Sequence, residues 1–156
     1  MTTAWGKLIQ EHRKEILERW LDRGLSFFSE RMDRTTPIGE ALSLGLSTLL
    51  DGIEENGKAF TAALNDVVRL FAVQNFPPSS SMALFFELTE ILRAVVTKLS
   101  GKKSLTDMEW NACRTRMEEI TLQAFDCYMA NREKIYQLKV DESSRRVFMA
   151  LRRVEA

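Results

Sequence analysis

The feature that most constrains the fold is a long stretch without helix-breaking residues: no glycine or proline occurs from Lys102 to Ala156. These two residue types most often end or bend a helix. A stripe of mostly apolar residues runs through the stretch at alternating spacings of four and three, which is the pattern of one helix face. Its members are Cys113, Met117, Ile120, Ala124, Cys127, Tyr128, Asn131, Ile135 and Leu138. The stretch therefore predicts a helix of more than about thirty residues, roughly 50 Å long.

Both ends of this predicted helix carry signals. Ser104 or Thr106 is the expected N-cap, and Thr106 with Glu109 fits a capping box. Near Val140 the register of the apolar residues shifts, and a second stripe takes over. It consists of Val140, Ser144, Val147, Leu151 and Val154. The sequence DESS at 141–144 therefore predicts either a kink or a break between two helices.

The rest of the chain also shows only helical spacing. One helix is expected from Thr3 to about Arg31, and a second from Pro37 to Asn56-Gly57, with Thr36 as its N-cap. A third is expected from about Lys58 to Asn75. Because no run alternates with a period of two residues between turn signals, we expect no sheet.

The glycines of the second helix and the prolines after the third indicate how helices meet. Gly39, Gly45 and Gly52 lie inside one helical run, which suggests that another helix passes close by or that this helix is short or bent. Pro77-Pro78 ends the third helix, and Ser79 or Ser80 is the expected cap of the fourth.

The fourth helix, MALFFELTEILRAVVTKL, is apolar around more than half of its circumference, which is typical of a helix buried between others. Glu87, Glu90 and Arg93 fall along one narrow strip, which we expect to be its solvent-exposed edge.

Length and charge limit the domain count and the classes of function. The 156 residues, of which 45% are hydrophobic, suffice for one all-α domain spanning 1–156, with 141–156 as a linker or interaction helix. The 22 basic and 22 acidic residues balance, which argues against a body that serves nucleic acid. We expect no transmembrane segment and no signal peptide, and hence a cytoplasmic protein.

The residues whose side chains could take part in catalysis lack the partners that catalysis requires. His12 is the only histidine and is expected to face solvent, so we expect no haem ligation and no metal site. Glu87 and Glu90 are read as a solvated edge, and Ser79 to Ser81 have no histidine to activate them. Cys113 and Cys127 are too far apart for a disulfide and are read as small apolar residues. We expect no enzyme, no metal and no cofactor.

The C-terminal segment SSRRVFMALRRV differs from the rest because it is both basic and amphipathic. Two arginine pairs lie seven residues apart, beside two apolar residues, and the set comprises Arg145, Arg146, Phe148, Leu151, Arg152 and Arg153. Three interpretations remain open: an ordinary solvated helix, a surface for a protein partner or for self-association, or a binder of anionic membranes or nucleic acid.

Several segments together resemble a known family. They are ILERWLDR (16–23), TTPIGEALSLGLSTLLDGI (35–53), VVRLFAVQNFPPSSSMALFFELTEILRAVV (67–96) and REKIYQLKVDESSRRV (132–147). This pattern resembles the RsbRD-type N-terminal domain of RsbT co-antagonist proteins, the sensory ends of stressosome components. The resemblance implies a globin-like helical bundle of about five to seven helices, without haem and usually dimeric. In that family a STAS domain follows, whereas this chain ends at Ala156.

The leading hypothesis is a non-enzymatic sensory or regulatory module of a bacterial type, which forms a homodimer and signals through an unidentified protein partner. The alternative is a carrier of a small apolar ligand in a pocket of the bundle. Both readings use the same predicted core or pocket walls: Trp5, Trp20, Phe71, Phe76, Phe85 and Phe86. In the first reading the last helix is the contact surface.

Overall fold

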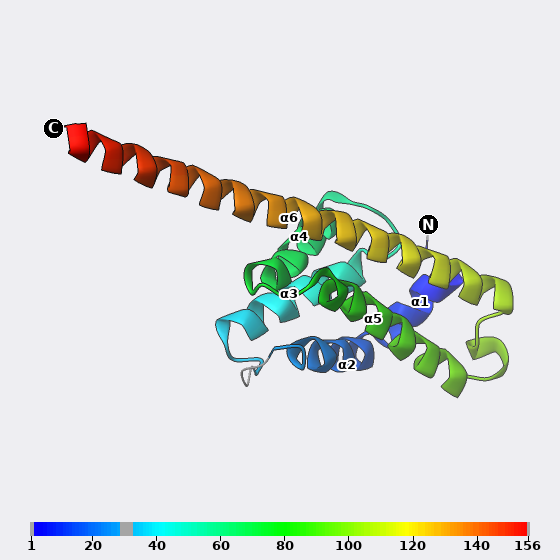
Figure 1. The fold of residues 1–156 in the computed structure, drawn as a ribbon. Coiled ribbons are helices and arrows are strands. Elements are labelled where there is room, and N and C mark those ends of the chain that lie inside the picture. Colours follow the sequence, from blue (N-terminus) through cyan, green and yellow to red (C-terminus); the bar gives the residue numbers. More distant parts are fainter. Residues whose placement is uncertain (1, 29–32, 156) are drawn as a thin grey trace.

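The computed structural model describes residues 2–28 and 33–155 and shows only helices in them (Figure 1). The predicted all-α class, the number of helices and the long C-terminal helix are confirmed. The helices are α1 (Ala4–Glu11), α2 (Arg13–Leu25), α3 (Pro37–Asp51), α4 (Lys58–Val73), α5 (Pro78–Lys98) and α6 (Asp107–Glu155), with a 3-10 turn η1 (Gly101–Lys103) before the last.

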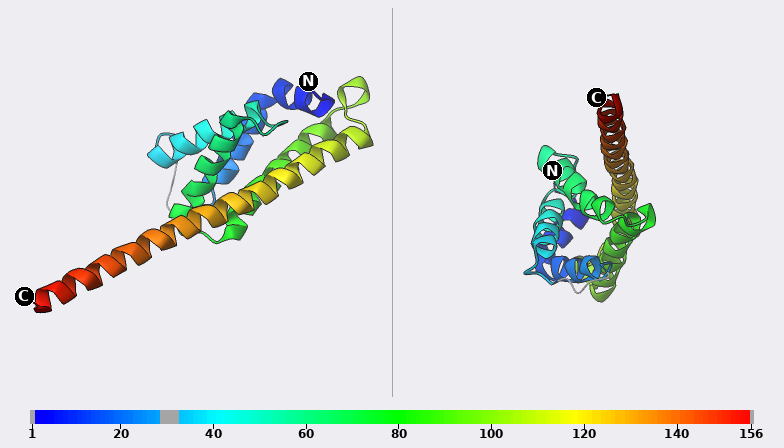
Figure 2. Two further views of the ribbon diagram at one scale, coloured as in Figure 1. Left: turned by 90° about the horizontal axis from the view of Figure 1, so that it is seen from above. Right: turned by 60° about the vertical axis from the view of Figure 1, so that its left-hand side comes forward.

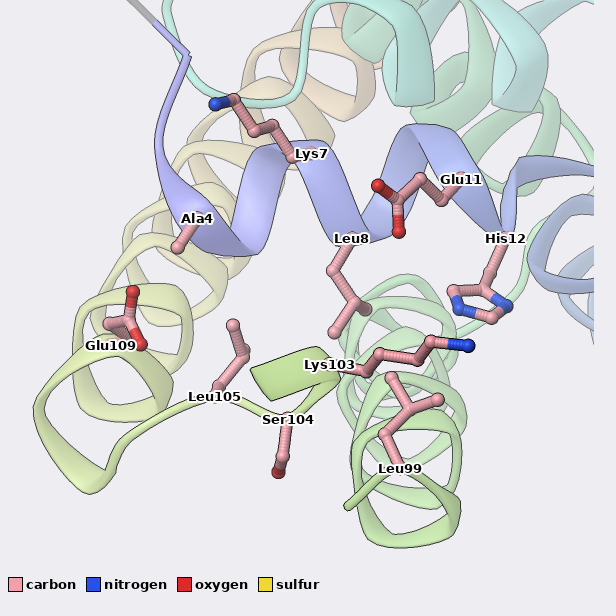
Figure 3. Close-up of a pocket in the computed structure, with 10 residues that line it drawn as sticks. All are labelled: Ala4, Lys7, Leu8, Glu11, His12, Leu99, Lys103, Ser104, Leu105 and Glu109. Atoms are coloured by element: carbon pink, nitrogen blue, oxygen red, sulfur yellow. The ribbon is translucent and has the colours of Figure 1, made fainter. Parts of the chain in front are cut away.

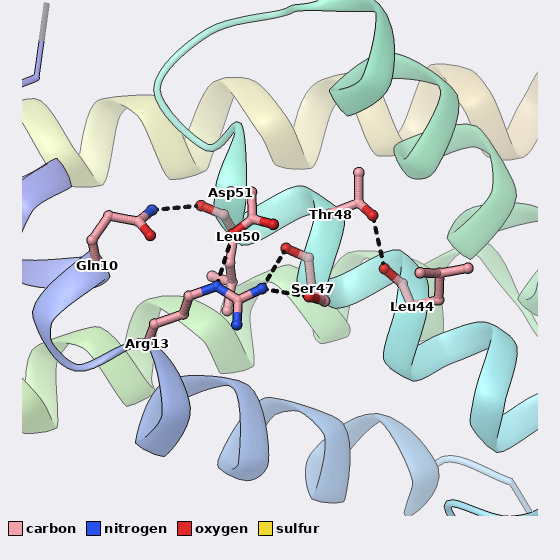
Figure 4. Close-up of polar contacts among 7 residues, drawn as sticks. All are labelled: Gln10, Arg13, Leu44, Ser47, Thr48, Leu50 and Asp51. Carbon is pink, nitrogen blue, oxygen red and sulfur yellow. Dashed lines mark hydrogen bonds and ion pairs between the residues drawn. The ribbon is translucent and has the colours of Figure 1, made fainter.

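The predicted single N-terminal helix is wrong, because the chain divides at His12 into α1 and α2. His12 has non-helical dihedral angles, φ −109° and ψ 18°. Long-range contacts of the flanking residues account for the break (Figure 4). Gln10 donates to the carbonyl oxygen of Leu50 at 3.1 Å, and the Arg13 guanidinium pairs with Asp51 at 2.8 Å. The predicted end of this segment at Arg31 lies outside the described residues, and α2 itself ends at Leu25.

The predicted start of α3 is confirmed, whereas its predicted end is not. Thr36 is the N-cap, and its hydroxyl accepts a hydrogen bond from the amide of Gly39 at 3.0 Å. The helix stops at Asp51 with Gly52 as C-cap, several residues before Asn56-Gly57. The intervening residues form the turn that leads into α4.

Helix α5 begins two residues earlier than a cap at Ser79 would allow. Pro77 is the N-cap and Pro78 the first helical residue, so the predicted cap at Ser79 or Ser80 is wrong. Proline suits a first helical position because that position needs no amide hydrogen bond. The turn before it is held from α6, since the Tyr128 hydroxyl donates to the carbonyl oxygen of Phe76.

Helix α6 is continuous over 49 residues, or about 73 Å at roughly 1.5 Å per residue. Its capping box is confirmed: the Glu109 amide donates to the Thr106 hydroxyl at 3.2 Å, and the Thr106 amide donates to the Glu109 carboxylate at 2.9 Å. The predicted kink or break at 141–144 is wrong. Two pairs at spacing i,i+4 hold the helix there: Gln137 with Asp141 at 2.9 Å, and Glu142 with Arg146 at 2.7 Å.

The helices enclose one apolar core, and α6 lies along one side of it. α3 packs on α4, α2 packs on α3 and α5, and both α4 and α5 pack on α6. Figure 2 shows the N-terminal part of α6 lying against this body and its C-terminal part projecting away from it. The C-terminal part of α6 is therefore a helical arm that stands away from the body.

Candidate functional site

The point where α6 leaves the body is fixed by polar contacts. The Asn131 side-chain amide donates to the Asn65 side chain at 2.9 Å and to the carbonyl oxygen of Cys127 at 2.8 Å. One residue later, Arg132 donates to the carbonyl oxygen of Ala72 on α4 at 2.9 Å. From Tyr136 to Glu155 every residue of α6 is exposed.

Local side-chain pairs stabilise the arm, which we define as residues 136–155. The Arg132 guanidinium lies 4.8 Å from the ring centre of Tyr136 and donates to its hydroxyl. This hydrogen bond, with the positive charge of Arg132, lowers the pKa of the exposed Tyr136 phenol below its usual value near 10. Further along, Arg152 lies 5.8 Å from the ring centre of Phe148.

The arm carries an apolar stripe with no partner among the described residues. Its large members are Val140, Val147, Leu151 and Val154, with exposed fractions of 56%, 60%, 58% and 85%. With Ser144 they follow alternating spacings of four and three, which is the heptad pattern of helices that pair side by side. An exposed apolar stripe of this kind marks an interaction surface.

The stripe extends onto the body, which the sequence analysis missed. Leu122, Phe125 and Met129 are exposed at 69%, 42% and 41%, on the part of α6 that packs on α4 and α5. Met129 and Val140 are eleven residues apart, which is about three helical turns, so they share a face. The same spacing in the printed sequence could have revealed this second face. We call Leu122, Phe125, Met129, Val140, Val147, Leu151 and Val154 together the α6 stripe.

The residues predicted to form a partner surface all lie on the arm and are all exposed: Arg145, Arg146, Phe148, Leu151, Arg152 and Arg153. Arg146 is paired with Glu142, while Leu151 belongs to the α6 stripe. The predicted surface thus lies on the exposed arm, and the α6 stripe contains one of its six residues.

The residues predicted to be core or pocket walls divide into three groups. Trp5, Trp20, Phe71 and Phe85 are buried in the core, and Phe76 is half-buried against it. Phe86 is 58% exposed, so its assignment to the core is wrong. It adjoins Glu87 on the outer side of α5, which no neighbouring helix covers completely.

Aromatic side chains fill the part of the core in which the alternative hypothesis, a carrier of an apolar ligand, would place its pocket. Phe28 packs on Phe71 and Phe76 with ring centres 5.5 and 5.2 Å apart, and Phe27 packs on Phe71 at 5.9 Å. At the other side, the Trp20 indole donates to the carbonyl oxygen of Leu84 at 2.9 Å. These contacts are those of a packed core.

The remaining chemical candidates are dispersed. Glu87 pairs with Arg23, and Glu90 pairs with Arg93 at 2.8 Å. The Ser81 hydroxyl is buried and has no hydrogen-bond partner among the described residues. Among residues 2–28 and 33–155, no three His, Cys, Asp or Glu side chains lie close enough together to hold a metal ion. No helix in these ranges is long and apolar enough to cross a membrane.

The two cysteines should differ sharply in reactivity. Burial raises the pKa of the Cys113 thiol to about 12, and burial with the charge of Asp126 raises that of the half-buried Cys127. At pH 8 roughly one Cys113 thiol in ten thousand is then ionised. We expect an aromatic disulfide reagent to leave Cys113 unmodified in the native protein and to react slowly with Cys127. Rapid modification of Cys113, measured by mass spectrometry of the native protein, would contradict its burial.

Comparison with known proteins assigns the family. Residues 14–143 match the RsbT co-antagonist protein RsbRD N-terminal domain. The chain belongs to this family. A protein of Archaeoglobus fulgidus described as uncharacterised is 29% identical over 133 residues, which cover 83% of each chain. No solved structure matches the chain. The region that matches the RsbRD N-terminal domain family leaves out α1 and the last part of the arm.

Proposed function

We propose that this RsbRD N-terminal domain protein is a non-enzymatic signalling module that forms a homodimer through the α6 stripe and acts on a regulatory protein partner. The observation that carries the proposal is a helical arm exposed along its whole length that nevertheless keeps apolar residues in heptad register. Water penalises such a stripe, and pairing with a second copy would remove it from water.

A second copy is the occupant that the pattern favours. In a two-fold symmetric dimer the same face serves both chains, so an apolar stripe on one helix can pair with the same stripe of a second copy. The chain carries no net charge, which means that self-association meets no overall electrostatic repulsion. The family's signalling character supports a protein partner, and a helix that runs from the body into the arm would transmit a change between the two.

The test is the oligomeric state of full-length protein by light scattering. We expect the wild type to have twice the 17.9 kDa chain mass, and the variant Val147→Asp/Leu151→Asp to be monomeric. Both side chains are exposed, so the double variant should keep its helical circular dichroism signal. Placing a carboxylate in a paired apolar seam leaves it buried without a partner, which costs several kcal/mol per dimer.

A matched control distinguishes the stripe from general exposure. Met149 is also exposed and apolar, at 49%, but lies on the opposite side of the helix from Val147 and Leu151. Met149→Asp should leave the dimer intact. A wild type that stays monomeric at high concentration would overturn the proposed dimer. Dissociation of the wild-type dimer by salt alone would instead show that ion pairs, and not the apolar stripe, hold the two copies together.

A further inference from the structure

A cavity of about 540 Å³ lies between α1, the C-terminal end of α5, the η1 turn and the start of α6 (Figure 3). Its volume falls in the range of roughly 300–1,000 Å³ that is usual for small-molecule sites. It is separate from the arm and from the aromatic core. Its α1 residues also lie outside the part of the chain that matches the family.

The floor of the cavity is aliphatic. Leu8 projects from α1, and Leu105 projects toward it from the segment before α6, as Figure 3 shows. Leu99, just after α5, completes this floor. Leu8 is buried while Leu99 and Leu105 are half-buried, so an aliphatic ligand body could cover apolar surface that now faces water.

One side of the cavity carries basic groups without partners. The Lys103 and His12 side chains both line the cavity (Figure 3), and neither makes a hydrogen bond or ion pair with any described residue. Glu109 lies on the opposite side, where its carboxylate is engaged by the Thr106 amide. Glu11 also lines the cavity and directly precedes His12, so an anionic group would find its best place at the Lys103 ammonium group, with His12 as a further donor.

The total charge of the side chains that line the cavity limits the charge of the anion that can bind. Lys7 and Lys103 are balanced by Glu11 and Glu109. A polyphosphate needs a strongly positive site and would be repelled by the two carboxylates. A single anionic group attached to an aliphatic body fits both the local basic corner and the leucine floor.

We propose that this cavity binds a small aliphatic monocarboxylate, with its carboxylate between Lys103 and His12 and its chain over Leu8, Leu99 and Leu105. The site rests on the proposed function in that it supplies the input of the signalling module. Lys103 and Leu105 lead directly into the Thr106 cap of α6, so a bound ligand bridges α1 and the start of the helix whose far end is the arm. It would favour whichever packing of α6 binds it more tightly.

The test is isothermal titration of full-length protein with sodium octanoate. We expect saturable binding of one octanoate per chain, and no binding of octylamine, which has the opposite charge. Lys103→Gln should weaken octanoate binding about tenfold, because a charge-assisted hydrogen bond is lost. Leu105→Ser should weaken it similarly. Both residues lie in the exposed or half-buried segment before α6, so the fold should persist.

Controls separate a built site from general attraction. Lys58→Gln removes the same charge from an exposed position at the start of α4 and should leave octanoate affinity unchanged. Equal weakening by Lys58→Gln, equal binding of uncharged octanol, or no binding by the wild type would each overturn the site. Preference for octyl phosphate over octanoate would also overturn the carboxylate assignment. The octanoate titration is repeated on the variant Val147→Asp/Leu151→Asp, which is expected to be monomeric. The proposed octanoate site and the proposed dimer can therefore fail separately.

Discussion

Arg116→Ala should lower the free energy of unfolding by about 4 kcal/mol, since it removes the packing and the hydrogen bonds of a long side chain that is almost wholly buried. The Arg116 guanidinium donates to the carbonyl oxygen of Ile53 at 2.8 Å and to the Asn56 side chain at 2.8 Å. It also lies 5.1 Å from the ring centre of Phe60. The substitution leaves the carbonyl oxygen of the buried Ile53 without its donor and opens a gap over the ring. Urea unfolding followed by circular dichroism measures the loss.

Two variants separate the causes of this effect. Arg116→Met keeps most of the packing over Phe60 but removes the hydrogen bonds, so it should recover part of the loss. Arg114 lies on the same helix but is exposed, and Arg114→Ala should change stability by no more than about 0.5 kcal/mol. Equal effects at positions 114 and 116 would show that Arg116 does not hold α6 to the turn between α3 and α4.

Features encoded within one turn of helix were predictable from the sequence. The Thr36 cap and the Thr106–Glu109 capping box depend on residues three positions apart, and both occur as predicted. The start of α4 at Lys58 follows from the glycine before it. These signals need no knowledge of the tertiary structure.

Features decided by distant partners were not predictable in this way. No glycine or proline marks the break at His12 in the sequence. The break depends instead on α3, which binds the Gln10 and Arg13 side chains. The exposure of Phe86 depends on which side of α5 the neighbouring helices leave open. A strongly apolar helix indicates burial on average, and it does not say which residue remains outside.

The apolar stripe of the arm was predictable from the sequence, whereas its extension onto the body was not. The change of apolar register near Val140 falls within the arm, where every residue is exposed. Leu122, Phe125 and Met129 were missed because their exposure, on a part of α6 that packs against the body, is visible only in the structure. The DESS segment was mistaken for a break because its i,i+4 partners, Gln137 and Arg146, lie outside it.

Gly45 should tolerate no side chain, although it lies in the middle of α3. A Cβ atom at this position would lie 2.4 Å from the Cγ2 atom of Val67 on α4, well inside contact distance. Val67 is 1% exposed and β-branched, so it has little freedom to move away. This close approach is the reason for a glycine that otherwise costs helix stability.

Gly45→Leu should therefore lower the free energy of unfolding by about 3 kcal/mol, and Gly45→Ala by about 2 kcal/mol, through overpacking of α3 against α4. In a free helix Gly→Ala would instead stabilise by about 1 kcal/mol, so the sign of the effect is diagnostic. Gly57, where an added Cβ meets nothing within 4 Å, provides the control: Gly57→Ala should change stability little. Val67→Ala creates room, so Gly45→Ala should cost less in that background than in the wild type. A stabilised Gly45→Ala, or strictly additive effects in the double variant, would mean that the two helices are not in contact at this point.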